Sequence, residues 1–203
     1  MRYSHIIWDF NGTILDDVQT CIDCVNTMLK KRGLKEIPDK KYYHKIFGFP
    51  VKDYYARLGF DFEKEDYHTL AVEWVDLYMK KSKKAPLNYG VLETLEYFKK
   101  QGVAQYILSA TELSMLKYQL KKLKIEEYFE EVVGLDNIHA GSKTALGIEL
   151  MNKLKPEKAL LIGDTTHDYE TAQKMGIECV LYSGGHMSRE TLEKCGTRII
   201  RSF

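Results

Sequence analysis

The sequence has few of the features that mark fibrous, disordered or membrane-spanning proteins. Four prolines and fourteen glycines in 203 residues exclude a collagen-like or proline-rich chain. Hydrophobic residues make up 44% and charged residues 29%, a globular balance that excludes a mainly disordered chain. No apolar run is long enough to span a membrane, and no cationic leader opens the sequence. We therefore expect a cytoplasmic protein that has no membrane partner.

The sequence also lacks an excess of charge of either sign and the set of cysteine pairs that would mark a zinc site. Thirty basic against twenty-nine acidic side chains give a net charge of +1, so we expect no nucleic-acid partner. The four cysteines include one C-x-x-C, Cys21 and Cys24, without the second pair or the histidines of a zinc site. Because these two fall in a helical pattern, buried thiols are favoured over metal or redox use. We expect a monomer or a homodimer.

Strands alternate with helices through the second half of the chain. After a first strand over 5–8, the pattern predicts strands over 103–108, 132–133, 159–162, 179–181 and 198–200. It predicts helices between them over 91–100, 112–122, 143–153, 168–175 and 188–195. Such alternation is typical of right-handed βαβ units. The predicted fold class is α/β, with a Rossmann-like parallel sheet.

An all-helical segment interrupts this sheet after its first strand. Helical periodicity runs from Val18 to a stop at Gly33, returns over 67–78 and ends in a lysine run that we interpret as a solvated helix end. We expect a helical domain at 16–85 inserted into a core of 1–15 and 86–203. The sequence Phe-Gly-Phe-Pro at 47–50 predicts a loop, either beside the active site or simply joining two helices.

Polar residues follow the predicted strands where a site would form. Asp9 follows the first strand, Ser109 the second and Asp164 the strand at 159–162, and Lys143 opens a helix. Parallel strands present their carboxyl ends at one edge, so these side chains should converge. Converging carboxylates need a divalent cation, and all-oxygen ligands suit Mg²⁺. With a hydroxyl and a lysine nearby, the pattern indicates a phosphate site. Asp168 taken alone favours a helix N-cap.

The ordered motifs resemble those of the haloacid dehalogenase-like superfamily. Residues 9–15, Asp-Phe-Asn-Gly-Thr-Ile-Leu, resemble its first motif, D-x-D-G-T-L. The apolar strand ending at Ser109 is similar to the second motif, Lys143 to the third, and 163–168 fits the fourth, G-D-x-x-x-D. The resemblance covers essentially the whole chain. It identifies the helical segment as similar to a C1-type cap and is nearest to phosphoglycolate-phosphatase-like members.

This resemblance implies a Mg²⁺-dependent phosphatase acting on a small phosphorylated metabolite. Asp9 would be the nucleophile that forms an aspartyl-phosphate, with Asn11, Ser109 and Lys143 completing the catalytic set. The metal ligands would be Asp9, the carbonyl of Asn11, Asp164 and Asp168. The phosphoryl group would be held by Gly12, Thr13, Ser109, Ala110 and Lys143.

One departure from the family pattern leaves alternatives open. Asn11 stands where the family phosphatases carry a second Asp that protonates the leaving group and activates water, and an amide cannot exchange that proton. His167, Thr13 or substrate-assisted water are candidate substitutes. The alternatives are a metal-free dehalogenase, a phosphonate hydrolase with Lys45 or Lys52 as a Schiff-base lysine, and a weakly active or non-catalytic phospho-ligand binder.

Overall fold

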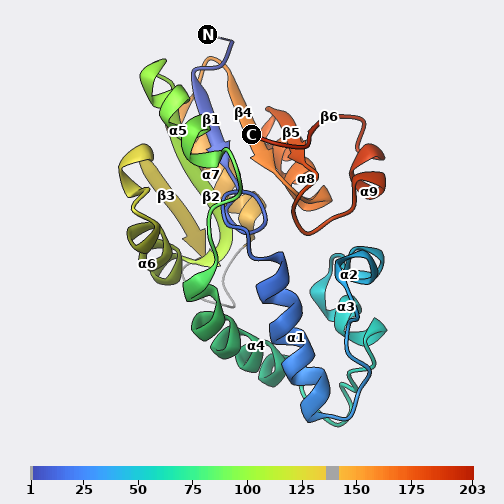
Figure 1. Ribbon diagram of the computed structural model, residues 1–203. Coiled ribbons are helices and arrows are strands. Elements are labelled where there is room, and N and C mark those ends of the chain that lie inside the picture. The colour runs from blue at the N-terminus through green and yellow to red at the C-terminus, as the bar shows by residue number, and fades with distance from the viewer. Residues whose placement is uncertain (1, 136–141) are drawn as a thin grey trace.

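A computed structural model describes residues 2–135 and 142–203. Its centre is one parallel sheet of six strands in the order β3-β2-β1-β4-β5-β6 (Figure 1). The predicted α/β class with a parallel sheet is therefore confirmed. The strands are β1 (His5–Trp8), β2 (Ala104–Glu112), β3 (Glu131–Leu135), β4 (Ala159–Gly163), β5 (Glu178–Tyr182) and β6 (Arg198–Ile200).

Helices cover both faces of this sheet, which is why its central strands are apolar on both sides. Ile6 and Trp8 of β1 point into a cluster with α5 (Val91–Lys100) and α6 (Leu113–Leu123), which the 3₁₀ turn η2 (Glu126–Tyr128) follows. Ile7 points to the opposite face. That face is covered by α7 (Lys143–Leu154), α8 (Thr166–Met175) and α9 (Arg189–Glu193).

A helical insertion between β1 and β2 lies beyond the carboxyl ends of the strands (Figure 1). It has its own buried cluster, built largely from aromatic and aliphatic side chains. The prediction of an all-helical insertion is confirmed, while the domain limits at 15/16 and 85/86 stay a prediction. No described helix of the molecule is both long and apolar enough to cross a membrane. The insertion contains α1 (Val18–Lys31), α2 (Lys40–Ile46), α3 (Val51–Arg57), α4 (Tyr67–Lys81) and the 3₁₀ turn η1 (Ser82–Lys84).

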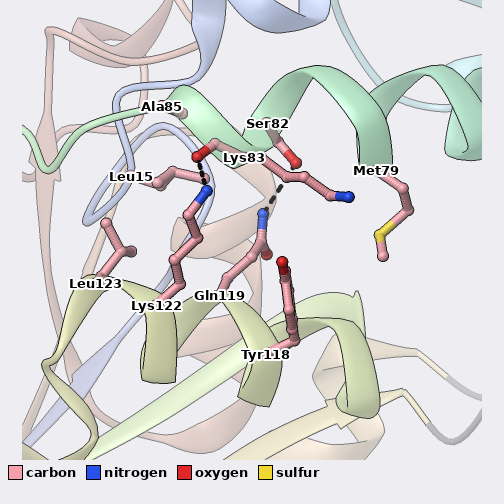
Figure 2. A pocket seen from close by; sticks show the side chains of 9 residues that line it. All are labelled: Leu15, Met79, Ser82, Lys83, Ala85, Tyr118, Gln119, Lys122 and Leu123. Carbon is pink, nitrogen blue, oxygen red and sulfur yellow. Dashed lines mark hydrogen bonds between the residues drawn. The ribbon is translucent and has the colours of Figure 1, made fainter.

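The end of the insertion is fastened to α6 of the α/β core. Figure 2 shows Lys122 reaching from α6 to the carbonyl oxygen of Lys83, while the Gln119 amide lies 3.4 Å from the Ser82 hydroxyl. The cavity between these elements is about 80 Å³, which is small compared with ordinary ligand pockets. These contacts link the end of the insertion to α6.

Several predicted boundaries differ from the structure by one or more residues, and two of these differences have identifiable reasons. β2 does not end at Leu108 but continues to Glu112, with a register shift against β3, because its last residues are polar and do not resemble a strand. α8 begins at Thr166 rather than Asp168. Thr165 is its N-cap and shares a capping box with Asp168, so two residues of the helix precede the acid.

Candidate active site

The order of the central strands brings the predicted chemical groups to one edge of the sheet. β1 lies between β2 and β4, so Asp9, Ser109 and Asp164 meet at neighbouring strand ends. A cavity of about 570 Å³ opens there between the core and the insertion. The predicted site residues that line it are Asp9, Asn11, Ser109, Ala110, Lys143, Asp164 and Asp168.

Three buried carboxylates form the floor of this cavity. One oxygen from each of Asp9, Asp164 and Asp168 lies within 4.8 Å of the others. The ammonium group of Lys143, also buried, donates hydrogen bonds to Asp9 and to Asp168. Burial raises the pKa of Asp9, and the neighbouring carboxylates add to this against the opposing effect of Lys143. Burial likewise raises the pKa of Asp164, to about 6.

Asp168 serves the helix and the site at once. Its Oδ2 accepts hydrogen bonds from the Thr165 amide at 2.9 Å and the Thr165 hydroxyl at 2.7 Å, which completes the capping box. Its Oδ1 accepts from Lys143. Burial would raise the pKa of Asp168, but Lys143 and these hydrogen bonds outweigh it and lower that pKa. The prediction that Asp168 is a helix N-cap was therefore wrong: Thr165 is the N-cap, and Asp168 is the N3 residue of the capping box while its other oxygen faces Lys143.

Gly12 and Thr13 lie next to Asp164, one of the three carboxylates, and do not line the cavity. Gly12 has a φ of 74°, and a Cβ there would lie 2.4 Å from an oxygen of Asp164, so only glycine fits. The fully buried Thr13 hydroxyl donates to Asp164 Oδ1 at 2.9 Å. Because these groups already have partners, their predicted contact with a phosphoryl group gains no support from the geometry.

The end of β2 supplies the polar side of the cavity. Ser109 is buried, and its hydroxyl accepts a hydrogen bond from the Thr111 amide at 3.1 Å. The Thr111 hydroxyl donates to the side-chain oxygen of Asn11 at 2.6 Å. Ala110 between them is exposed and lines the cavity. The extension of β2 beyond Leu108 thus carries these groups to the carboxylate floor.

Asn11 is held through its whole side-chain amide. Its nitrogen donates to Asp17 Oδ2 at 2.8 Å and to the Tyr78 hydroxyl at 2.6 Å, and its oxygen accepts from Thr111. The Tyr78 hydroxyl donates to the same oxygen of Asp17. An amide fits here because it can donate to the carboxylate of Asp17, which a second carboxylate could not do unless it were protonated.

Asp17 and His186 are buried site residues that the sequence analysis missed. His186 Nε2 lies 3.3 Å from Asp17 Oδ1, its Nδ1 lies 2.8 Å from the Tyr43 hydroxyl, and its amide donates to Asp164 Oδ2 at 2.6 Å. Burial disfavours the imidazolium, but Asp17 outweighs it and raises the pKa of His186 to about 9. The signal for His186 was its place in a Gly-Gly-His turn after β5, at the same edge of the sheet.

The remaining candidate residues from the sequence differ in whether they are buried and whether they line the cavity. His167 lines the cavity, its ring centre lies 5.3 Å from that of Phe49, and burial lowers its pKa. Lys45 and Lys52 are exposed and do not line the cavity. Cys21 and Cys24 are buried free thiols, and burial raises the pKa of Cys24 to about 11. These facts weigh against a Schiff-base lysine and favour the structural interpretation of Cys24, whereas Cys21 lines the cavity, with its sulfur within 4.8 Å of ligand atoms of Asp17 and His186.

The loop at 47–50 joins α2 to α3 and also faces the site. Phe47 and Phe49 both line the cavity, and the Phe47 ring centre lies 5.4 Å from that of His186. Phe47 also packs against buried clusters of the insertion and of the core. Both interpretations of this loop therefore describe part of what it does.

Comparison with known proteins agrees with this arrangement. A model of the haloacid dehalogenase-like hydrolase family matches residues 6–182. A phosphoglycolate phosphatase of Aquifex aeolicus is 27% identical over 193 residues, covering 90% of this chain and 85% of that one. Another, from Pseudomonas fluorescens, is 26% identical over 207 residues, covering 96% and 75%.

A solved structure shows the same fold. A haloacid dehalogenase-like hydrolase of Streptococcus pneumoniae superposes with a TM-score of 0.81 at 22% identity, covering 98% of this chain and 93% of that one. The sheet order, the helical insertion and the family match over most of the chain together establish that this protein belongs to the haloacid dehalogenase-like hydrolases.

Proposed function

We propose that this protein is a Mg²⁺-dependent phosphatase that hydrolyses a small phosphorylated metabolite through an aspartyl-phosphate on Asp9. One observation carries the proposal: three buried carboxylates and one buried lysine converge at the bottom of a cavity between the core and the insertion. Carboxylates at such spacing repel one another, and the arrangement suits a ligand that combines a cation with an anionic group. A phosphate ester bound with a metal ion is such a ligand.

The residues present fit Mg²⁺. The floor offers carboxylate oxygens, which are the hard ligands that this ion prefers, and one lysine leaves an excess of buried negative charge. Asp9 and Asp164 would hold the ion together with Asp168 and the backbone carbonyl of Asn11. The bound ion would neutralise charge on the phosphoryl oxygens and keep the carboxylates ionised.

In the first chemical step a carboxylate oxygen of Asp9 attacks phosphorus. The bond from phosphorus to the ester oxygen breaks, and that oxygen leaves with its electron pair. Lys143, which contacts Asp9, stabilises the negative charge that the phosphoryl oxygens carry through the transition state, and the Ser109 hydroxyl donates to one of them. The leaving oxygen takes its proton from water or from a group of the substrate.

In the second step water attacks phosphorus of the aspartyl-phosphate, which returns the Asp9 carboxylate and releases inorganic phosphate. Family members use an acidic side chain at position 11 to deprotonate this water. Asn11 cannot do so, and its amide is already bound to Asp17, Tyr78 and Thr111. We therefore expect slow breakdown of the intermediate and a burst of the first product.

The hydrogen bonding of the Asn11 amide also favours a second candidate, a phospho-ligand binder with little turnover. An amide that is fully hydrogen-bonded in the protein acts as a scaffold and takes no part in proton transfer. The two candidates share the binding chemistry of the floor and differ only in whether the phosphoryl group is released.

Hydrolysis of phenyl phosphate with and without metal tests both candidates. We expect turnover with Mg²⁺, loss of at least about 100-fold in excess EDTA, and inhibition by Ca²⁺, whose larger and looser shell misplaces the nucleophile. Full activity in EDTA would contradict the metal-dependent mechanism. If no ester is hydrolysed but beryllium fluoride with Mg²⁺ binds in calorimetry, the protein is the binder.

A further inference from the structure

The cavity has two chemically different halves. Its floor is the carboxylate cluster described above, and the opposite wall comes largely from the insertion. That wall is aromatic and aliphatic, and side chains at the ends of β3 and α6 continue it. Its principal members are Phe47, Phe49, Trp74, Val75, Met115 and Leu135.

One face of α4 is turned toward this space. Ala71, Trp74, Val75 and Tyr78 follow one another at helical spacing and all line the cavity. The rings of Trp74 and Tyr78 are stacked with their centres 4.8 Å apart, so the wall is already ordered. Ala71 and Val75 are half-buried, yet neither belongs to the buried clusters of the described residues. Their apolar surface is thus directed at whatever occupies the cavity.

Among the described residues, the wall offers no lysine or arginine to hold a negative charge, and its polar groups are His68, Glu112 and hydroxyls such as that of Tyr54. Among the described residues that line the cavity, Lys143 is the only lysine or arginine, and its ammonium lies between Asp9 and Asp168. An acid of the wall, Glu112, is the N-cap of α6 and would repel an anion.

Three described histidines line the cavity. His186 is held by Asp17 at 3.3 Å, the ring centre of His167 lies 5.3 Å from that of Phe49, and His68 is in the first turn of α4. A carboxylate or a second phosphate beside Trp74 and Val75 would be buried against apolar side chains, with no described lysine or arginine of the lining except Lys143 to pair with it, which is unfavourable.

We infer that the substrate is a phosphate monoester whose leaving group is uncharged and predominantly apolar, with an aromatic or hydrocarbon body. The inference rests on the proposed function, since it assigns the phosphoryl group to the floor. A cavity of about 570 Å³ can hold a phosphate together with a group of ring size or larger. A carboxylated ester such as phosphoglycolate, the substrate in the names of the relatives above, fits this wall poorly.

The deciding comparison uses two esters that react at the same kind of oxygen. Benzyl phosphate and 4-carboxybenzyl phosphate share the alkoxide leaving group and differ in a remote carboxylate. This keeps the effect of Asn11 on leaving-group protonation almost constant between them. We expect kcat/KM to favour benzyl phosphate by about 10- to 100-fold. Equal values, or a preference for the carboxylated ester, would overturn the inference.

A charge placed on the wall should reverse this discrimination. Val75→Arg puts a guanidinium where the carboxylate would lie, so we expect the ratio to shift toward 4-carboxybenzyl phosphate by at least about 10-fold. Val72→Arg is the matched control, because Val72 is on the same helix, is 36% exposed and does not line the cavity. An equal shift in both variants would mean that the charge acts at long range, and would overturn the assignment to this wall.

A binding measurement separates this inference from the proposed function. Benzylphosphonate and 4-carboxybenzylphosphonate cannot be hydrolysed, and their dissociation constants can be measured by calorimetry on the wild-type protein with Mg²⁺. Tighter binding of the uncharged analogue by about 10-fold supports the inference even if no ester turns over, in which case only the phosphatase proposal fails. Turnover combined with equal binding of the two analogues would overturn the inference alone.

Discussion

The floor and the wall of the cavity consist of side chains of opposite polarity. The floor concentrates three carboxylates and a lysine, all buried, on strand ends and on the first turns of α7 and α8. The wall comes mainly from α2, α3, α4 and their connections, and it is lined by aromatic and aliphatic side chains. The floor is fixed by the main-chain bonds of the sheet, whereas the wall is fixed by side-chain packing within the insertion.

This difference separates reaction from selection. Groups that handle a phosphoryl group must be held in a fixed geometry, and a parallel sheet provides that at its carboxyl edge. Groups that contact the rest of the substrate need only a suitable shape and polarity. Substitutions on the floor should therefore change the rate for every substrate. Substitutions on the wall should change which substrate is preferred.

The largest expected effect is on the floor. Asp9→Asn removes the nucleophile while keeping the shape of the side chain, so we expect kcat to fall by at least about 1,000-fold for every ester. After a rapid acid quench with substrate, intact mass should show a phosphoryl group on the wild type and not on the variant. Asp16→Asn is the control: Asp16 is exposed and does not line the cavity, so its activity should stay within about twofold. Substantial turnover by Asp9→Asn would remove Asp9 as the nucleophile.

The next largest effect on activity is expected for Asn11 and Asp17, which lie where the floor meets the insertion. Asn11→Asp alone would bring two carboxylates together, because the amide nitrogen now lies 2.8 Å from Asp17 Oδ2. The exchange Asn11→Asp with Asp17→Asn restores one amide and one carboxylate. We expect this double variant to raise kcat/KM for benzyl phosphate by about 10- to 1,000-fold, since an alkoxide needs a proton to leave.

The exchange also has an internal standard. The kcat/KM for 4-nitrophenyl phosphate should change by less than about fivefold in the double variant, because the leaving group of this ester is a stable anion. Measuring both single variants completes a double-mutant cycle, in which strong coupling between positions 11 and 17 is expected. If both esters respond equally, another residue already supplies the proton and Asn11 only shapes the site.

The difference between floor and wall also explains how much of the fold and of the site could be predicted from the sequence. The strand 5–8 and the last strand at 198–200 were predicted with their observed limits, since short apolar runs between turns identify them. Asp9, Ser109 and Asp164 could be expected to meet, because the order of parallel strands brings their ends together. The floor is thus encoded in local motifs and topology.

The contacts between core and insertion could not be predicted in this way. The pairing of Asp17 with His186 depends on a loop that passes so close to Asp164 that a Cβ at Gly185 would lie 2.1 Å from its carboxylate. The spacing of Trp74 and Val75 indicates a helix face but not what that face meets. Both features arise from packing between segments far apart in the chain.

The smallest expected effect concerns the support of the wall. Arg32, after α1, donates to Glu65 at 2.5 Å, to Glu73 at 2.6 Å and to the Met28 carbonyl at 2.9 Å, and its side chain is 13% exposed. Arg32→Met keeps the apolar stem and loses these bonds, so we expect a loss of about 1–2 kcal/mol of unfolding free energy. The core offers a control in Lys153→Met, whose pair with Glu131 is largely exposed and should contribute less than about 0.5 kcal/mol.

Acid should reduce the difference between wild type and Arg32→Met. Hydrogen bonds from Arg32 lower the pKa of Glu65, and they also lower that of Glu73 against the opposing effect of burial. A lowered carboxyl pKa stabilises the fold above the unfolded value of about 4.3, and this contribution is lost as pH falls below it. Urea unfolding at pH 7 and near pH 3.5 should show the gap between the two proteins narrowing, while turnover of phenyl phosphate at pH 7 stays within about twofold. A gap that is the same at both pH values would mean that Arg32 supports the insertion through packing and not through its carboxylate partners.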